Sequence, residues 1–474
     1  MMKILTGFSA ALLLAGCATQ ATQQTLVPEV APQWRQPQAN VDATGTTSVL
    51  TRDWWRSFGS SELDSLLETV QVQSYDIAAA VARVTQAQAT ATIAGAALLP
   101  ELNGNFGATR NGRLGGDGNG TATGTVYQAG LSATYELDFW GRNRAVRDSA
   151  RAGLRAAEFD RDTVHLTVTA GVASSWLQTV GLRERVAIAD LSVASAQRLL
   201  DVIESRARAG AANPLELAQQ RGVLAAQMRA RAAIRQQAED SLTTLAVLLG
   251  RNPSLLVLAG TELNKLQAPA VVAGLPADLL VRRPDIARAE AQLSGADANI
   301  IAARAAMLPR ISLGGDITAG SNRVSSVFDN PVYSLAAGLA APIFNAGRLA
   351  AGRDLALAQR EELLANYRRA IVAAFGDVEV ALNAVAGIDA QRIAQEEELR
   401  QAQRAFNLAE SRYRAGAETS LTLLDAQRTL YAAQDAAAQL RTLRLQAAVS
   451  LYKALGGGWQ LTAQEQKESA QPVS

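Results

Sequence analysis

The chain carries almost none of the side chains on which enzymes and metal sites depend. Among its 474 residues there are one cysteine, Cys17, and one histidine, His165. A single cysteine cannot form an internal disulfide, and a single histidine argues against a histidine-based metal site or a Ser-His-Asp triad. The sequence therefore predicts a protein that is not an enzyme and that needs neither a metal ion nor a cofactor.

An excess of charge is also missing. The formal net charge is +1, charged residues make up 19% of the chain, and hydrophobic residues make up 48%. The balance of charges gives no electrostatic reason to bind nucleic acid. The high hydrophobic content excludes a disordered polymer.

Long hydrophobic runs are missing after the first twenty residues. No later segment reaches the roughly 18 uninterrupted apolar residues of a membrane-spanning helix, so we expect no such helix. If the mature protein crosses a membrane, the sequence predicts that it does so with strands.

The first twenty residues have the pattern of a secretory signal. Lys3 precedes an apolar run from Ile4 to Ala15, and Cys17 follows Gly16. This spacing resembles the lipobox of bacterial lipoproteins, which implies a signal peptide at 1–16, a covalent lipid on Cys17, and sorting to the outer membrane. Several acyl chains give stable anchoring where one is marginal. The alternative is a cysteine that happens to lie in an ordinary signal peptide.

The rest of the chain is a tandem duplication. Ser205–Ala211 reappears as Ser411–Ala417, and Gly141-Arg142 reappears as Gly347-Arg348, both at an offset of 206 residues. Further upstream, Leu98–Pro100 matches Met307–Pro309 at an offset of 209. These matches predict the following organisation: a lipidated N-terminal segment at 17–65, a first repeat at 66–280, a second repeat at 281–460 and a polar tail at 461–474.

Each repeat has the same predicted order of elements. A helix at 66–98 or 281–307 ends at a Leu-Pro pair, alternating segments follow, and a long helix then covers 144–208 or 348–414. A glycine turn reverses the chain into a second helix at 217–249 or 421–455. The long helices contain no proline, and at 1.5 Å per residue they reach about 90–100 Å. Helices of this length predict coiled-coil hairpins, although an ordinary bundle core would show the same apolar spacing.

The segments between the helices alternate strictly in polarity. From Tyr127 to Phe139 the odd positions are apolar and the even positions are polar or glycine. Tyr333–Ile343 also has apolar odd positions, with Ser334, Ala336, Gly338, Ala340 and Pro342 between them. Weaker partners precede them at 102–112 and 311–318. The lengths suit membrane strands, and aromatic residues stand at both ends, as interfacial girdles require. The alternative is a soluble two-sided sheet packed on the helices.

Four strands are too few to close a membrane barrel. The smallest membrane barrels have about eight strands, and an open sheet edge in lipid leaves backbone groups without hydrogen bonds. The strands therefore predict a homo-oligomer, and geometry alone allows two, three or more copies.

Several motifs, in order along the mature chain, resemble the TolC family of outer-membrane efflux ducts. The branch they resemble is the lipoprotein branch, similar to NodT and OprM, which serves resistance-nodulation-division pumps. The motifs are Trp54–Phe58, Tyr135–Gly141, Arg282–Ile286, Ala289–Leu293, Pro342–Gly347 and Leu421–Gln427, after the lipobox at Leu14–Cys17.

This resemblance implies the architecture and the partners. The fold would combine long α-helical hairpins with a membrane β-barrel: a homotrimer with a twelve-stranded barrel, continuous with a helical tunnel through the periplasm. The expected function is a passive exit duct for drugs or other small molecules. An inner-membrane resistance-nodulation-division transporter would supply energy through a periplasmic adaptor, the membrane fusion protein. The expected location is the bacterial outer membrane, lipid-anchored and extending into the periplasm.

The resemblance also assigns roles to single residues. The hairpin tips, with Arg208, Gly210, Arg414 and Gly416, would contact the adaptor. Asp425 would form a gating ring of carboxylates; its alternative is a solvated surface aspartate. Some family members have a second acid three positions earlier, where this chain has Thr422.

Three further positions belong to the predicted machinery. Tyr413 would tether the closed state, or alternatively only pack the tip. Gly141 and Gly347 would allow the bend between strand and helix, because glycine adopts backbone angles that other residues avoid. Two other functions stay open: an exit duct for type I protein secretion, and a lipid-anchored coiled-coil scaffold without a pore.

Overall fold

Long helices and a single sheet account for most of the described chain. The computed structural model describes residues 28–36, 51–112, 124–259, 263–269 and 271–460. The chain divides into two units, Met1–Val30 and Ala31–Ser474, and every element below belongs to the second unit.

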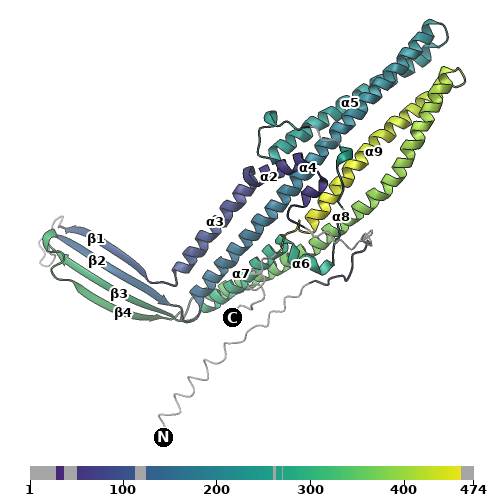
Figure 1. The fold of residues 1–474 in the computed structure, drawn as a ribbon. Coiled ribbons are helices and arrows are strands. Elements are labelled where there is room, and N and C mark those ends of the chain that lie inside the picture. The colour runs from purple at the N-terminus through teal and green to yellow at the C-terminus, as the bar shows by residue number, and fades with distance from the viewer. Residues whose placement is uncertain (1–27, 37–50, 113–123, 260–262, 270, 461–474) are drawn as a thin grey trace. The chain divides into compact units, whose positions relative to one another are not determined.

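The two repeats follow one another with the same order of helices and strands (Figure 1). The first contains α2 (Ser61–Gln73), α3 (Tyr75–Ala96), β1 (Glu101–Asn111), β2 (Gly124–Leu137), α4 (Arg142–Arg208) and α5 (Pro214–Leu248). The second contains α7 (Pro284–Ala305), β3 (Arg310–Ser321), β4 (Val332–Ala340), α8 (Arg348–Arg414) and α9 (Ser420–Ala454). Short helices fill the connections: η2 (Trp54–Phe58), η3 (Pro253–Leu255), η4 (Leu263–Lys265), η5 (Pro276–Asp278), α6 (Leu279–Arg282) and η6 (Val324–Ser326).

The predicted long helices are confirmed. α4 and α8 each contain 67 residues and turn back into α5 and α9, which contain 35 residues each. Each return helix starts a little earlier than predicted because a capping residue precedes it. The side chains of Asn213 and Thr419 accept hydrogen bonds from the backbone N–H groups of Glu216 and Thr422.

The prediction of one unbroken first helix was wrong. Instead, α2 ends at Gln73 and α3 begins at Tyr75. Ser74 between them has extended backbone angles, and its side chain accepts a hydrogen bond from the backbone N–H of Ile77. A serine that caps a new helix interrupts the old one.

The sheet has the order β1-β2-β3-β4, and all neighbouring strands are antiparallel. The two hairpins of the sheet have the same strand register, as expected for a duplicated sequence. Glu101 pairs with Thr134 in the first hairpin, and the matching residues Arg310 and Ala340 pair in the second. β4 ends at Ala340 rather than at the predicted Ile343, because Pro342 has no backbone N–H for a ladder.

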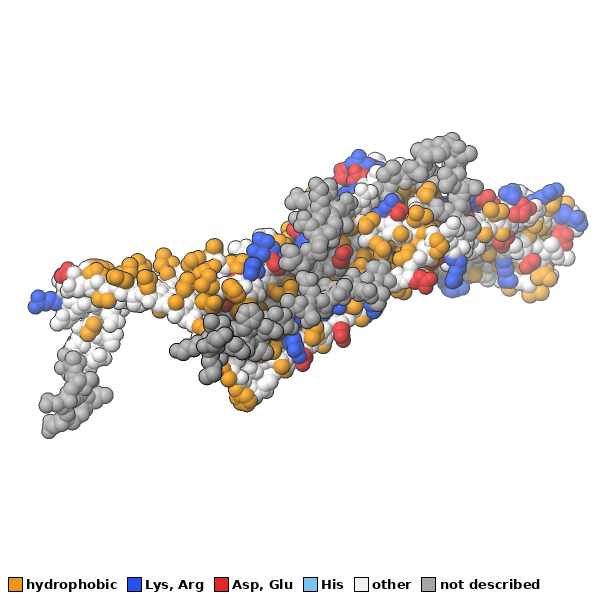
Figure 2. Space-filling model, turned by 90° about the horizontal axis from the view of Figure 1, so that it is seen from below, with side chains coloured by type: hydrophobic (Ala, Val, Ile, Leu, Met, Phe, Trp, Pro, Cys, Tyr) orange, Lys and Arg blue, Asp and Glu red, His pale blue; other side chains and the backbone are white. Residues whose placement is uncertain are grey.

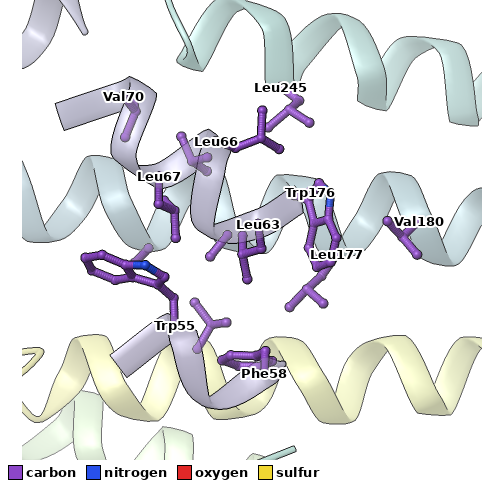
Figure 3. Close-up of a cluster of buried hydrophobic side chains, with 14 of the residues drawn as sticks. Trp55, Phe58, Leu63, Leu66, Leu67, Val70, Trp176, Leu177, Val180 and Leu245 are labelled. Carbon is purple, nitrogen blue, oxygen red and sulfur yellow. The ribbon is translucent and has the colours of Figure 1, made fainter. Parts of the chain in front are cut away.

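The largest hydrophobic core lies where α2 and η2 pack against the middle of α4 and the end of α9 (Figure 3). Trp54 and Trp55 are buried there, and the ring of Trp54 stacks on Tyr452 with 5.0 Å between centroids. Trp176 of α4 is fully buried and donates from Nε1 to the Glu62 carboxylate. The tryptophan pair therefore packs the N-terminal part of the chain against the helices.

One described helix contains a stretch that is apolar enough to cross a membrane. By length and composition alone, α8 passes this test, with a mean hydropathy of 1.7 over its best window, of which 28% is buried. α8 also supplies Ile371, Ala374 and Val378 to a protein core together with Leu451 of α9. A single helix that passes this test is weak evidence for a membrane span.

Arg283 ties α7, α8 and α9 together at the level of the largest core. Its guanidinium donates hydrogen bonds to Asp285, to Asp377 of α8 at 3.0 Å, and to the carbonyl oxygen of Ala454 at the end of α9. Burial opposes ionisation of Asp285, but the hydrogen bond and charge of Arg283 outweigh it and lower the pKa of this carboxyl. The Arg-Arg-Pro-Asp motif therefore has a structural role within this chain.

Candidate functional site

The register separates the sheet into one apolar and one polar face. Leu131 of β2 lies opposite Ile317 of β3, and one position along Ser132 lies opposite Asp316. The first pair belongs to a large exposed apolar surface: Leu102, Phe106, Leu131, Leu313, Ile317, Tyr333, Leu335 and Leu339. Figure 2 shows hydrophobic side chains gathered over the sheet end, whereas charged side chains concentrate on the helical hairpins. An exposed face of this kind needs an apolar surrounding.

The polar face borders a hollow at the base of the sheet. This hollow has a volume of about 970 Å³, and its lining includes Thr134, Glu136, Arg142, Ser312 and Gly338. Thr134, Glu136, Ser312 and Gly338 occupy the even positions of their strands. Tyr135, Leu313 and Ala337, at odd positions, also line the hollow, so it borders both kinds of position at this end of the sheet.

Both edges of the sheet are open. Every residue of β1 and every residue of β4 is exposed, and each of these strands pairs with one neighbour among the described residues. A row of backbone N–H and C=O groups without partners is a template for another strand.

The bends between strand and helix contain the predicted glycines. Gly141 precedes α4 with φ +77°, and Gly347 precedes α8 with φ +80°. This left-handed region strains residues that have a Cβ, so the bends require glycine.

Asp138 fixes the first bend in a way that the sequence analysis missed. Its carboxylate accepts hydrogen bonds from the backbone N–H groups of Asn143 and Arg144, at 2.9 and 2.8 Å. Burial opposes ionisation, but these hydrogen bonds and the charge of Arg144 outweigh it and lower the pKa of Asp138. The available signal was an acidic residue just before a helix, where the helix dipole favours negative charge.

Two side chains of the same motif brace the corner. The Glu136 carboxylate accepts hydrogen bonds from Nε and Nη2 of Arg142, at 2.9 to 3.2 Å. The indole Nε1 of Trp140 donates to the carbonyl oxygen of Pro309, at 2.8 Å. The second contact joins the end of the first hairpin to the start of the second.

The two hairpin tips have the same turn. Gly210 and Gly416 have φ +72° and +74°, and the following N–H groups close the turn on Arg206 and Arg412. The residues predicted to contact an adaptor lie here: Arg208, Gly210, Arg414 and Gly416 are all exposed. Nothing within 4 Å of either glycine would meet an added Cβ, so both tips present an open backbone surface.

Tyr413 links the second tip to the first. It is 2% exposed, its hydroxyl donates to Glu216 of α5 at 3.4 Å, and its backbone oxygen accepts from Arg206 of α4 at 2.9 Å. We call Arg206, Tyr413 and Glu216 the tip latch. Burial, and secondarily the charge of Glu216, raise the pKa of Tyr413, which keeps the phenol protonated at physiological pH. The sequence identified Tyr413 but neither of its partners.

Asp425 lies in the second turn of α9 and is exposed. Its backbone oxygen accepts from Thr429, and no ion pair to its carboxylate occurs among the described residues. The hydroxyl of Thr422, one turn earlier, donates a hydrogen bond to the carboxylate of Glu418. The carboxylate of Asp425 is therefore available to solvent or to another copy.

Two other positions that the sequence singled out are Cys17 and His165. Cys17 lies outside the described residues. His165 is half-buried on α4, and burial lowers its pKa. No group of three or more His, Cys, Asp or Glu side chains able to hold a metal ion occurs in the described part of the chain.

The family of this chain follows from its relatives. The family model for outer membrane efflux proteins matches residues 66–251 and 275–457, one stretch for each repeat. The chain belongs to this outer membrane efflux protein family, and its location is the outer membrane.

Two relatives illustrate the range of cargo. The pyoverdine export outer membrane protein OpmQ of Pseudomonas aeruginosa is 50% identical over 466 residues, covering 97% of this chain and 98% of its own. The cation efflux system protein CusC of Escherichia coli is 32% identical over 459 residues, covering 96% and 98%.

Solved structures share the architecture. A crystal structure of CusC superposes with a TM-score of 0.80 at 30% identity, covering 91% of this chain and 99% of its own. The outer-membrane channel OprN superposes with a TM-score of 0.82 at 26% identity, covering 92% and 100%. The fold is that of TolC-like outer membrane channels, mostly helical with a small sheet, and these relatives are efflux channels rather than enzymes.

Proposed function

We propose that this chain forms, as a homotrimer, the exit duct of a tripartite efflux system. Three copies of the four-stranded sheet make a twelve-stranded barrel, with the apolar face toward lipid and the polar face around water. The helical hairpins continue the duct through the periplasm. The observation that carries this proposal is the sheet itself: it is two-faced, yet both of its edges are open.

The duplication supplies the missing strand pairing. Within the chain, Ala133 of β2 lies opposite Gly315 of β3. The offsets of 206 and 209 convert this pair into Leu339 of β4 and Phe106 of the partner subunit's β1. Since the same offsets relate the two hairpin registers within the chain, we assign this register to the joint between copies. Both residues belong to the apolar face, as a continuous lipid-facing surface requires.

The helices also offer surfaces for contact between neighbouring copies. α3 and α5 pack on one side of α4, and α7 and α9 pack between α4 and α8. The outer helices carry exposed apolar side chains: Tyr75, Val81 and Ile93 on α3, Met228 and Val247 on α5, and Leu355, Val372, Val380 and Ile393 on α8. Docking α8 of one copy against α3 and α5 of the next covers these side chains and closes the wall.

The tips form the gate and the adaptor contact. In a trimer, Asp425 repeats around the axis as a ring of carboxylates, which attracts cations. The tip latch holds the second hairpin against the first and thereby keeps the tips together. Arg208, Gly210, Arg414 and Gly416 lie on the exposed surface where a periplasmic adaptor would bind.

The duct itself is passive, and an inner-membrane resistance-nodulation-division transporter supplies the energy and selects the cargo. The names of the relatives support a small-molecule cargo set by the pump, because they range from pyoverdine to cations and toluene. A lipid on Cys17 anchors each copy, as in the relative described as an outer membrane lipoprotein, SilC. Mass spectrometry of the mature N-terminus tests this anchor, and an unmodified Cys17 contradicts it.

Planar-bilayer recording tests the duct. Purified protein should insert as discrete conducting units, with a larger conductance when the tip latch is broken by Tyr413→Phe and Arg206→Gln. A complete lack of conductance in both proteins would support the non-pore scaffold instead.

Cellular accumulation tests the cargo. Deletion of the gene should raise the intracellular level of pyoverdine-like siderophores, drugs or metal ions, and complementation should lower it. Unchanged accumulation of all three classes, with loss of a secreted protein, would favour the type I secretion duct.

A further inference from the structure

Helices α4 and α9 approach each other closely at Gly181. A Cβ added to Gly181 would overlap the hydroxyl and methyl groups of Thr442 and lie 3.0 Å from its Cβ. Thr442 is buried, and its hydroxyl donates to the carbonyl oxygen of Ala438 on its own helix. Only a residue without a side chain lets the two backbones come this close.

Two ion pairs bind the same helices beside this contact. Arg185 of α4 forms a two-point bridge to Asp435 of α9, with N–O distances of 2.7 and 3.0 Å. Arg441 of α9 reaches Glu184 of α4 at 2.8 Å. The Arg185 side chain is only 15% exposed, so water screens its bridge less than it screens a surface pair.

On one side of this level, the second hairpin is firmly built into the molecule. Leu445, Val449 and Tyr452 of α9 belong to the largest core, and Arg283 holds the end of α9. Gln446 of α9 also donates to the Ser174 carbonyl oxygen of α4, at 3.1 Å.

On the side of the tips, α4, α8 and α9 share a separate hydrophobic cluster that includes Leu199, Phe406 and Leu430, and two buried glutamines lie at the same level. Gln220 and Gln427 are both 0% exposed, and their Oε1 atoms have no hydrogen-bond partner in the part of the chain that the structure describes. Their amide nitrogens donate to the Ala196 oxygen and the Tyr431 hydroxyl. A buried carbonyl oxygen without a partner costs free energy, and an arrangement that admits water would recover it.

We propose that α9 pivots on α4 at the contact of Gly181 with Thr442, with Arg185, Asp435, Glu184 and Arg441 as the residues that position this pivot. The part of the second hairpin between this level and the tips swings when the duct opens. This inference rests on the proposed gate at the tips and adds the point about which the gate moves.

The length of the lever makes a small rotation sufficient. Asp425 lies seventeen residues before Thr442 on α9, or about 25 Å along the helix. A rotation of on the order of 15°, the size of rigid-body rotations in allosteric proteins, displaces Asp425 by about 6 Å. Repacking confined to one helix crossing is therefore enough to widen a ring of three such residues.

Distances between spin labels on α4 and α9 test the pivot in the full-length lipidated protein. One pair, Gln197→Cys with Arg428→Cys, lies between the pivot and the tips. The other pair, Thr167→Cys with Ser450→Cys, lies beyond the pivot; all four positions are exposed. Each pair is measured with the tip latch intact and with it broken by Tyr413→Phe and Arg206→Gln, and conductance is recorded for the same proteins.

Breaking the latch should lengthen the Gln197–Arg428 distance by about 5 Å, because Arg428 lies fourteen residues from the pivot at Thr442. The Thr167–Ser450 distance should stay unchanged. Equal changes in both distances would overturn the pivot, because the hairpin would then move as a whole. A conducting latch variant with the first distance unchanged would overturn it too. If the latch variant conducts no better than the parent, the proposed gate is wrong and the following variants decide about the pivot.

With the latch intact, Arg185→Asp should broaden the first distance distribution only, and adding Asp435→Arg should narrow it again. Gly181→Ala should shift the same distance, Thr442→Ala should partly reverse that shift, and Gly171→Ala is the matched control. Gly171 lies on the same helix with nothing within 4 Å of an added Cβ. A first distance that stays the same in both Arg185→Asp and Gly181→Ala would overturn the pivot.

Discussion

The guanidinium of Arg206 lies over the ring of Tyr413, 4.6 Å from its centroid, and also donates a hydrogen bond to the backbone oxygen of Tyr413. These residues are 207 positions apart and belong to different hairpins. The contact joins the two hairpin tips, so it is the place to begin testing the proposed gate.

Breaking the latch should favour the open duct. Tyr413→Phe removes the hydrogen bond to Glu216, which we expect to contribute about 1 kcal/mol and thus to raise open probability about fivefold. Arg206→Gln removes the cation–π contact and should act in the same direction. Single-channel recording of both single variants and the double variant measures their coupling. Fully additive effects would show that the two residues do not act as one latch.

Asp425→Asn should reduce the preference for cations over anions several-fold, because it removes one carboxylate per subunit from the proposed ring. Reversal potentials under a salt gradient measure the change. Asp240→Asn, at an exposed position of α5 outside the ring, is the control and should have no effect. Equal effects of the two substitutions would show that Asp425 does not face the conducting path.

The register between copies predicts a specific cross-link. Leu339→Cys combined with Phe106→Cys should form disulfides between subunits under oxidation, because residues directly opposite in an antiparallel pair have Cβ atoms about 5 Å apart. Gel electrophoresis without reductant should show a covalent trimer. Leu339→Cys with Asn105→Cys places the thiols on opposite faces and is the matched control. Preferential cross-linking of the control pair would shift the register by one residue.

Asp138 should make stability depend on pH. Because its pKa is lowered in the folded protein, its carboxylate stabilises the fold above the ordinary aspartate pKa of about 3.9. This contribution is lost as the pH falls through the lowered folded value. Asp138→Asn should therefore lower the unfolding midpoint at pH 7, by an amount equivalent to about 1 kcal/mol, and the difference from the parent should shrink once the pH falls below the ordinary aspartate pKa toward the lowered folded value. A difference that stays constant throughout an acid titration would contradict this role.

The local pattern of the sequence was enough for the elements and their faces. Strict alternation around Leu131 assigned the strand and its apolar side, because successive side chains of a strand point to opposite faces. Glycines at 210 and 416 marked the hairpin turns, and the absence of proline allowed helices of 67 residues. The exact ends of helices and strands depend on single residues: Ser74 caps α3 and thereby separates it from α2, and Pro342, which has no backbone N–H, limits β4.

Contacts between distant segments were decided by the tertiary structure alone. The sequence identified Tyr413 but not Arg206 and Glu216. It used the Arg282–Ile286 motif only as a mark of the family and did not show that Arg283 clamps α8 and α9. Nothing local marks Gly181 as the crossing point of two helices. Periodicity fixes which side of an element is apolar, because that depends on neighbours a few residues away. Which side chains meet across two elements depends on how those elements pack together, and only the folded chain contains that information.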